Sequence, residues 1–208
     1  MRKKLSLKKK EKTILNQYGY NVVFPYNVIL DIDETLIHTS VEHDKMTILL
    51  RPQLRTFLDY CYNNFNVGYW TLGTKKYCLH ILSKILTTEQ LNKTKNSSII
   101  ICRTDDKDDK YEELVRTHIF EVNKLDNMLT KPLSYLFNTE PYKYWFKSNN
   151  TLIIDNSSNA ISINIHNSIL IPSFYDDSHD CYLIYLINWL KKIKGNIVKI
   201  EKPSFFQY

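Results

Sequence analysis

The stretch Val28-Ile29-Leu30-Asp31-Ile32-Asp33-Glu34-Thr35-Leu36 decides the fold of this chain. Its first three residues are apolar and two of them are β-branched, which predicts a buried strand at residues 27–31. Two carboxylates follow at the end of this strand, on Asp31 and Asp33. The carboxyl ends of parallel strands are where open α/β sheets bind ligands. This layout therefore indicates a phosphoryl-transfer site, in which one carboxylate attacks phosphorus and the other carries a proton.

A lone Asp-x-Asp motif has a second interpretation, because such pairs also occur in turns and helix caps as solvated acids. The rest of the chain favours the first interpretation. Strands alternate with helical segments, which predicts a parallel sheet with helices on both faces. We expect further strands at residues 46–50, 66–71, 98–102, 151–155 and 169–172, helices after Pro52 and at 75–86 and 181–193, and a short element at 133–136.

Four more motifs follow the first in a fixed order. They are Leu50-Arg51-Pro52 with Phe57-Leu58, then Tyr69-Trp70-Thr71-Leu72-Gly73, then Thr130-Lys131-Pro132-Leu133-Ser134, and last Ile153-Ile154-Asp155-Asn156-Ser157. Together with residues 31–40, the series resembles the haloacid dehalogenase (HAD) superfamily. Within it, the chain resembles the Fcp/Scp-type RNA polymerase II C-terminal-domain phosphatases, also called the NLI-interacting-factor family, over residues 26–190. The resemblance implies an α/β protein with a Rossmann-like three-layer HAD fold, a central parallel sheet and no cap domain.

The resemblance also implies a catalytic set. Asp31 would be the nucleophile that forms an aspartyl-phosphate, and Asp33 the general acid and base. Thr71 would donate its hydroxyl to the phosphoryl group, and Lys131 would neutralise its charge. Taken alone, a strand-end threonine bonds its own turn, and a lone lysine such as Lys131 or the nearby Lys124 is solvated. We prefer Lys131 because the Leu-Ser that follows it fits the family.

A divalent cation completes the implied site, because two carboxylates beside a phosphate would otherwise repel it. Mg²⁺ prefers hard oxygen ligands. By resemblance the ligands come from Asp31, the main-chain carbonyl of Asp33, and the pair Asp155 and Asn156. The sequence leaves open which member of this pair contacts the metal directly.

The expected reaction is Mg²⁺-dependent hydrolysis of phosphoserine or phosphothreonine in a protein segment. The segment from Ser40 to Met46 leaves no room for a cap, and the stretch from Thr71 to Lys131 accommodates only a helix, a strand and a loop. An open site suits a macromolecular substrate, of which the RNA polymerase II C-terminal repeats are one candidate. Residues 41–50 are shorter than the family's β insertion, which holds a proline of those repeats. The reaction is thus better defined than the substrate.

Charge is concentrated at the start of the chain. Among 208 residues the formal net charge is +6, and residues 1–12 alone account for it, with seven basic residues against Glu11. We expect a basic, disordered tail at residues 1–20 and a single HAD-like domain at 21–208. The tail is either a solvated arm or a nuclear-localisation or nucleic-acid contact. The balanced charge of the remainder argues against a nucleic-acid groove.

The four cysteines are scattered without a C-x-x-C pair, so neither a zinc site nor a disulfide framework is indicated. No signal-peptide-like or membrane-spanning stretch is evident. We therefore expect an intracellular protein, nuclear or cytoplasmic, that does not contact membranes. Two other functions stay open: a binding module that keeps the fold with weak or no catalysis, and a nucleic-acid end phosphatase. The presence of Asp31, Asp33, Thr71, Lys131 and Asp155 argues against the binding module.

Overall fold

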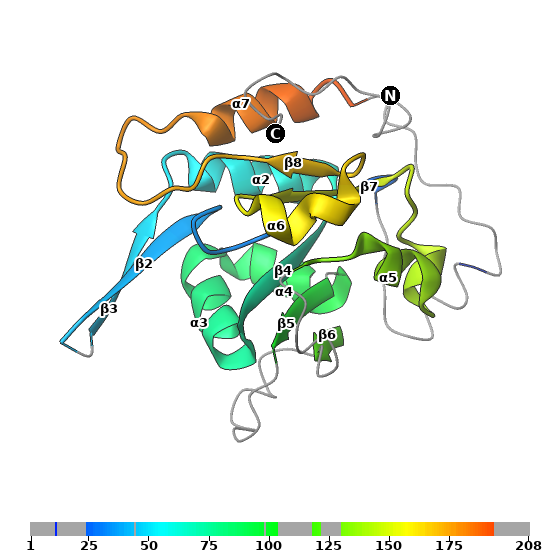
Figure 1. Ribbon diagram of the computed structural model, residues 1–208, viewed down its shortest axis with the longest axis horizontal. Helices are drawn as coiled ribbons and strands as arrows, with labels where there is room; N and C mark the ends of the chain where they lie inside the picture. Colours follow the sequence, from blue (N-terminus) through cyan, green and yellow to red (C-terminus); the bar gives the residue numbers. More distant parts are fainter. Residues whose placement is uncertain are drawn as a thin grey trace.

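A single parallel sheet organises the chain (Figure 1). The computed structural model describes residue 11 and residues 24–43, 45–97, 99–103, 118–121 and 130–193. Six parallel strands are arranged in the order β6-β5-β4-β1-β7-β8. Their bounds are β1 Asn27–Leu30, β4 Asn66–Thr74, β5 Ile99–Arg103, β6 His118–Glu121, β7 Thr151–Asp155 and β8 Ser168–Leu170. The strand that carries the first motif, β1, lies in the middle of the sheet between β4 and β7.

The sheet separates two hydrophobic clusters, because successive side chains of a strand point to opposite faces. Val28 and Leu30 belong to one cluster and Ile29 to the other. The first cluster is covered by α2 (Leu54–Asn64), α3 (Lys75–Ile85) and α7 (Tyr182–Leu190), and the second by α5 (Leu133–Asn138), the 3-10 helix η2 (Tyr142–Tyr144) and α6 (Ser158–Ile161). This is the three-layer α/β/α arrangement that the sequence predicts.

The predicted core strands are confirmed within a few residues, and so is the helix that follows β4. Thr74 caps α3 with its side chain, which accepts a hydrogen bond from the backbone N–H of Tyr77. The helix after Pro52 begins at Leu54, because Gln53 has a left-handed backbone with φ of 65° and interrupts the helical path. The closing helix is shorter than the predicted 181–193.

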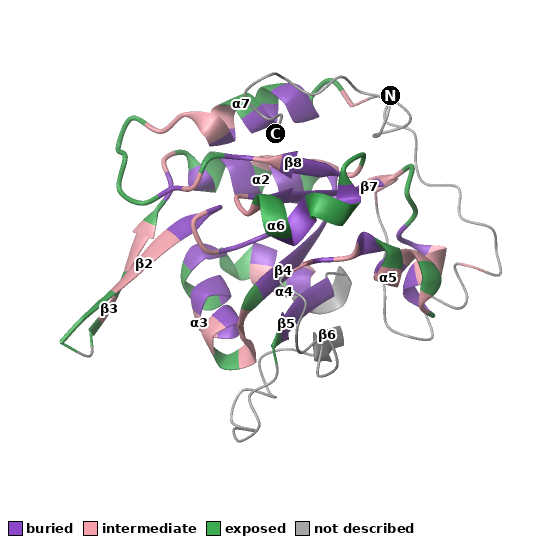
Figure 2. Ribbon diagram, in the orientation of Figure 1, coloured by how far each residue is buried: buried purple, intermediate pink, exposed green. Residues whose placement is uncertain are grey.

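One hairpin differs from the prediction of a lone strand at 46–50. Strand β2 (Ile37–Glu42) pairs antiparallel with β3 (Lys45–Leu50). The hairpin projects from the body of the molecule (Figure 1), and only its base is buried (Figure 2). Strand β2 becomes more exposed toward its tip and carries polar residues on both faces, so its sequence gives a weak strand signal.

Between Thr71 and Lys131, the described residues form no separate cap domain. They form α3, α4 (Thr88–Ser97), β5 and β6, of which α4 and β6 were not predicted. None of the four cysteines, all of which lie in the described ranges, forms a disulfide bond. Within the described ranges, no helix combines the length and the apolarity needed to cross a membrane. The predicted basic tail lies outside the described residues, apart from Glu11.

Candidate active site

Asp31 lies at the carboxyl end of the central strand. Its backbone N–H donates to the carbonyl of Ile154 on β7, which fixes the residue beside the end of that strand. The side chain of Ile32 points into the core, and the backbone N–H groups of Leu36 and Ile37 donate to its carbonyl at 2.9 and 3.3 Å. The chain therefore turns tightly after Asp31 and brings Asp33 back to the same edge of the sheet.

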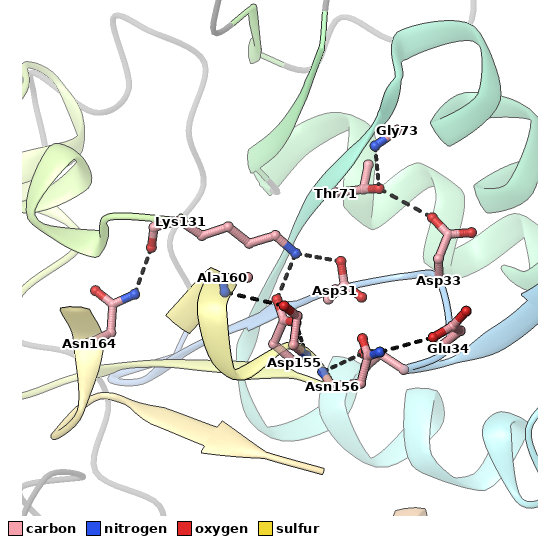
Figure 3. Close-up of polar contacts among 12 residues, drawn as sticks. Asp31, Asp33, Glu34, Thr71, Gly73, Lys131, Asp155, Asn156, Ala160 and Asn164 are labelled. Carbon is pink, nitrogen blue, oxygen red and sulfur yellow. Dashed lines mark hydrogen bonds and ion pairs between the residues drawn. The ribbon is translucent and has the colours of Figure 1, made fainter. Parts of the chain in front are cut away.

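Lys131 joins two of the predicted carboxylates. Its Nζ lies 2.5 Å from Oδ1 of Asp31 and 2.7 Å from Oδ2 of Asp155. Figure 3 shows its extended side chain reaching between them. All three residues are at most 6% exposed. Burying three charged groups carries a large desolvation cost that pairing does not always repay. Here two carboxylates share one ammonium, so the cluster indicates a functional site rather than a stabilising salt bridge.

The backbone around Lys131 is also held in place. Its N–H donates to the carbonyl of Ala160 at 2.6 Å, and its carbonyl accepts from Nδ2 of Asn164 at 2.6 Å. Burial on its own would lower the pKa of Lys131, but Asp31 and Asp155 outweigh burial and keep the pKa above its usual value. The ammonium thus stays charged, and it forms a fixed positive centre in the site.

Asp155 lies at the end of β7 and uses both of its carboxylate oxygens. Oδ2 accepts from Lys131, and Oδ1 accepts from the backbone N–H of Ser157 at 2.8 Å. Burial raises the pKa of Asp155, and the negative charge of Asp31 raises it further, while Lys131 offsets part of the increase. The geometry gives Asp155 one evident task, which is to hold Lys131 beside Asp31.

Asp33 and Thr71 meet on the other side of Asp31 (Figure 3). The Thr71 hydroxyl donates to Oδ2 of Asp33 at 3.5 Å and accepts from the backbone N–H of Gly73 at 2.9 Å. The sequence left open that Thr71 only bonds its own turn. The structure contains that bond, to Gly73, together with the contact to Asp33. Burial raises the pKa of the Asp33 carboxyl, the nearby charge of Asp31 adds to this, and hydrogen bonds from Tyr77 and Thr71 oppose it.

Asn156 follows β7 and is held by the turn after Asp33. Thr35 donates its hydroxyl to Oδ1 of Asn156 at 3.0 Å and accepts from the Asn156 backbone N–H at 3.1 Å. The amide Nδ2 of Asn156 donates to Oε2 of Glu34 at 3.3 Å and to the hydroxyl of Ser173 at 2.9 Å. The amide oxygen is therefore aimed at the first motif.

The oxygens at this edge fit a hard divalent cation. Neither Oδ2 of Asp31 nor the main-chain carbonyl of Asp33 accepts a hydrogen bond from any residue in the described part of the chain. An almost buried carboxylate oxygen without a donor is costly unless something else binds it. No three His, Cys, Asp or Glu side chains of the described ranges form a metal cluster. A cation here would instead use one carboxylate, one carbonyl and the amide of Asn156, with water, as Mg²⁺ accepts.

A family model settles the relationship of the chain to known proteins. The model of the NLI interacting factor-like phosphatases matches residues 26–201, which is most of the sequence. The chain belongs to the NLI interacting factor-like phosphatase family. The predicted resemblance to this family is thereby confirmed, and the sheet topology confirms the predicted α/β fold with a central parallel sheet.

Two relatives have names that agree with this family. A CTD phosphatase-like protein of Invertebrate iridescent virus 3 is 33% identical over 89 residues, which cover 33% of this chain and 47% of that protein. A protein of Schizosaccharomyces pombe named for its FCP1 homology domain is 27% identical over 198 residues, which cover 87% of this chain and 75% of that protein. The chain therefore spans less than half the length of the viral relative.

Two solved structures are similar to this NLI interacting factor-like chain. One is fission yeast Fcp1, an RNA polymerase II CTD phosphatase, bound to beryllium fluoride, with 14% identity and a TM-score of 0.46. The other is a structure of Fcp1 described as an essential RNA polymerase II CTD phosphatase, with 13% identity and the same TM-score. Each match covers 94% of this chain, and they cover 50% and 58% of the Fcp1 chains.

The structure also contains polar contacts that sequence reasoning missed. Arg51 lies buried under the first motif and donates to the carbonyl of Thr35 at 3.0 Å. Tyr77, in the helix predicted at 75–86, donates its hydroxyl to Oδ1 of Asp33. Arg51 precedes helix α2 and Tyr77 lies in the first turn of α3, and neither position carries a local signal of such contacts. Lys124, the competitor of Lys131, lies outside the described residues.

Proposed function

We propose that this protein is a Mg²⁺-dependent phosphatase that hydrolyses phosphoserine or phosphothreonine in a protein segment through an aspartyl-phosphate. The observation that carries the proposal is the buried contact of Lys131 with both Asp31 and Asp155 at the carboxyl edge of the sheet. A fixed cation beside a buried carboxylate is the arrangement needed to bind a phosphate dianion against the negative charge of its own nucleophile.

In the first half of the reaction, a carboxylate oxygen of Asp31 attacks phosphorus. The bond from phosphorus to the serine or threonine oxygen breaks, and Asp33 gives its proton to that oxygen. Lys131 and the Thr71 hydroxyl stabilise the charge on the remaining phosphoryl oxygens. The products of this half are the free alcohol, the carboxylate of Asp33 and an acyl phosphate on Asp31.

In the second half, water attacks the same phosphorus. The Asp33 carboxylate takes one proton from this water, and the bond between phosphorus and the Asp31 oxygen breaks. Inorganic phosphate leaves, and both aspartates return to their starting forms. One residue thus acts as acid in the first half and as base in the second, as the principle of microscopic reversibility requires.

Magnesium, when bound, supplies positive charge that offsets the two carboxylates and polarises the phosphoryl group. We propose Asp31, the Asp33 carbonyl and Asn156 as its protein ligands. Asp155 is less suited to direct ligation, because one of its oxygens is held by the Lys131 ammonium, which would repel a second cation, and the other accepts from the Ser157 backbone N–H. The amide oxygen of Asn156 accepts from the neutral hydroxyl of Thr35 and keeps a lone pair for a metal. Asp155 supports the site by holding Lys131. The predicted metal pair is thereby divided into a ligand and a positioning residue.

A protein substrate is supported by the absence of a cap domain among the described residues, since a flexible segment can reach an uncovered site. The names of the viral and yeast relatives agree with a phosphoprotein substrate. RNA polymerase II C-terminal repeats are one candidate. Four cysteines without a disulfide bond suit an intracellular protein. We also propose that residues 21–208 act as one domain and that the basic tail at 1–20 is a separate segment.

The proposal is tested with p-nitrophenyl phosphate and with phosphoserine, phosphothreonine and phosphotyrosine peptides, each with and without Mg²⁺. We expect Mg²⁺-dependent turnover by the intact protein and none by Asp31→Asn. Rapid acid quenching of a reaction with a ³²P-labelled peptide should leave label on the protein as a hydroxylamine-sensitive acyl phosphate. Folded, Mg²⁺-loaded protein without turnover of any of these substrates would reject the proposal.

A further inference from the structure

Tyr77, on helix α3, contacts Asp33, the proposed proton donor. It lies in the first turn of α3, which begins directly after β4, the strand that contains Thr71. Its ring packs against the hydrophobic cluster that α3 covers, and its hydroxyl reaches out to Oδ1 of Asp33. The ring is therefore held by packing while the hydroxyl enters the site, so its direction is fixed.

The protons of this contact can be assigned. A phenol has one proton, and an ionised carboxylate can only accept. The Tyr77 hydroxyl donates its hydrogen bond to Asp33. In the 3.2 Å contact between Tyr77 and Thr39, the Thr39 hydroxyl must therefore be the donor. A directed chain then runs from Thr39 on β2 through Tyr77 to Asp33. Such chains polarise each member and strengthen the last bond.

Gly73 leaves room for this arrangement. A Cβ at position 73 would lie 2.8 Å from Cδ1 of Tyr77 and 3.2 Å from Oγ1 of Thr71. The first distance is a clash, so any larger residue at this position would push the tyrosine ring away from where it now lies. The glycine at position 73 is thus matched to the position of the Tyr77 ring in this chain.

The two oxygens of Asp33 have different surroundings. Oδ1 accepts from Tyr77, whereas Oδ2 faces Thr71, the residue expected to bind the phosphoryl group. Tyr77 therefore binds Oδ1 of Asp33 through a hydrogen bond and fixes the rotation of the Asp33 carboxyl group. The other oxygen is directed toward the place where the leaving group would lie.

We propose that Tyr77 is a positioning residue for the reaction: it holds Oδ1 of Asp33 so that Oδ2 carries the transferred proton. The inference rests on the proposed function, because it assumes that Asp33 protonates the leaving oxygen. It adds a residue, and a link from the β2–β3 hairpin to the site, that the proposed function does not contain.

Leaving-group dependence tests this role. p-Nitrophenolate departs without a proton, whereas phenolate and the serine alkoxide need one. A loss of proton delivery therefore slows phenyl phosphate and a phosphoserine peptide more than p-nitrophenyl phosphate. For Tyr77→Phe we expect kcat/KM to fall by about 10- to 100-fold on the poor leaving groups, and by much less on p-nitrophenyl phosphate. Asp33→Asn should show the same selectivity in stronger form.

Two further variants separate positioning from packing. Thr39→Val removes the donor to Tyr77 and should shift the same ratio in the same direction, to a smaller extent. Gly73→Ala should also lower the poor-leaving-group rates by displacing the ring. If Gly73→Ala acts through Tyr77, the double variant Gly73→Ala/Tyr77→Phe will show the same ratio of poor-leaving-group to p-nitrophenyl phosphate rates as Tyr77→Phe alone. Tyr185→Phe, an exposed tyrosine on α7, is the matched control and should change no rate.

The possible failures are distinguishable. Equal losses on all three substrates in Tyr77→Phe, or no loss at all, would reject the positioning role while leaving the phosphatase function intact. An intact protein without phosphatase activity would reject both. Circular dichroism and thermal unfolding of each variant identify a folding defect, and Thr39→Val then supplies the decisive ratio because it leaves the tyrosine ring in place.

Discussion

Arg51 and Asp180 form a two-bond ion pair beneath the candidate active site. Nε of Arg51 lies 2.9 Å from Oδ1 of Asp180, and Nη2 lies 2.7 Å from Oδ2. The Arg51 side chain has no exposed surface and that of Asp180 only 6%. The remaining donors of Arg51 bind the carbonyls of Thr35 at 3.0 Å and Pro172 at 2.9 Å. The planar guanidinium matches this set, and a lysine would not.

This pair predicts a large stability effect. Arg51→Met would leave Asp180 nearly buried without its cation and the Thr35 carbonyl without its donor. We expect the free energy of unfolding to fall by about 3–5 kcal/mol, measured by urea denaturation. Activity should fall as well, since Thr35 holds Asn156.

The control for this prediction is Glu89→Gln. Glu89 pairs with Lys93 at 2.7 Å across one turn of α4, but both side chains are exposed. Exposed pairs of this kind contribute little to stability, so the urea midpoint should not change measurably. An effect of Arg51→Met no larger than that of Glu89→Gln would show that the buried pair contributes nothing specific.

Sequence reasoning could bring three residues of the candidate site together because each lies in the carboxyl-terminal half of a strand or directly after it. Asp31, Thr71 and Asp155 come from β1, β4 and β7, which are neighbours in the sheet. Once the sheet is predicted to be parallel, their carboxyl ends must share one edge. Lys131 came only from the family resemblance, since the loop that carries it has no periodicity to interpret.

Other features of the fold and the site could not be predicted from the sequence, for physical reasons. Asp180 is 129 residues from Arg51 and Tyr77 is 44 residues from Asp33, so neither contact belongs to a local pattern. Helix α4 is rich in polar residues and β6 has only four residues, which leaves both without a clear hydrophobic period. Contacts of this kind depend on how the helices pack, which one sequence alone does not specify.

Gly68 predicts a packing effect in the middle of the sheet. A Cβ there would lie 2.7 Å from Cγ2 of Ile99, 2.8 Å from Cδ1 of Ile29 and 3.1 Å from the Ile99 carbonyl oxygen. The strand backbone cannot move away, because β4 is paired on both sides. We expect Gly68→Ala to lower the free energy of unfolding by about 1–3 kcal/mol in thermal or urea unfolding. A wild-type melting temperature would contradict the close packing at this point.

Lys131 predicts a catalytic effect much larger than that of other lysines. Lys131→Met removes the positive centre that faces the phosphoryl group and leaves Asp31 and Asp155 without their shared partner. We expect kcat on p-nitrophenyl phosphate to fall by about 100- to 1,000-fold. Lys143→Met is the matched control, because Lys143 forms an exposed pair with Glu140 and lies over the ring of Tyr144, away from the proposed site residues. Equal activity of the two variants would rule out Lys131 as the counter-charge.

The division between Asn156 and Asp155 predicts different responses to metal. A chelator should abolish activity, and added Mg²⁺ should restore it. Because Asn156 directs an amide oxygen toward the first motif, Asn156→Ala should raise the Mg²⁺ concentration for half-maximal activity by at least about 10-fold. Asp155→Asn instead loosens Lys131, so kcat should fall while the half-saturating Mg²⁺ concentration stays near that of the intact protein.

Metal affinity can be measured without turnover, as the rise in melting temperature with increasing Mg²⁺. The intact protein and Asp155→Asn should both be stabilised by Mg²⁺, and Asn156→Ala should need more metal for the same rise. Asn138→Ala, an exposed asparagine that only bonds the Ser134 carbonyl, should respond like the intact protein. If Asp155→Asn loses the Mg²⁺-dependent rise and Asn156→Ala keeps it, the assignments are reversed. The hydrogen bond from Ser157 to Asp155 would then have to break when metal binds, because Oδ1 would be the ligating oxygen while Lys131 holds Oδ2.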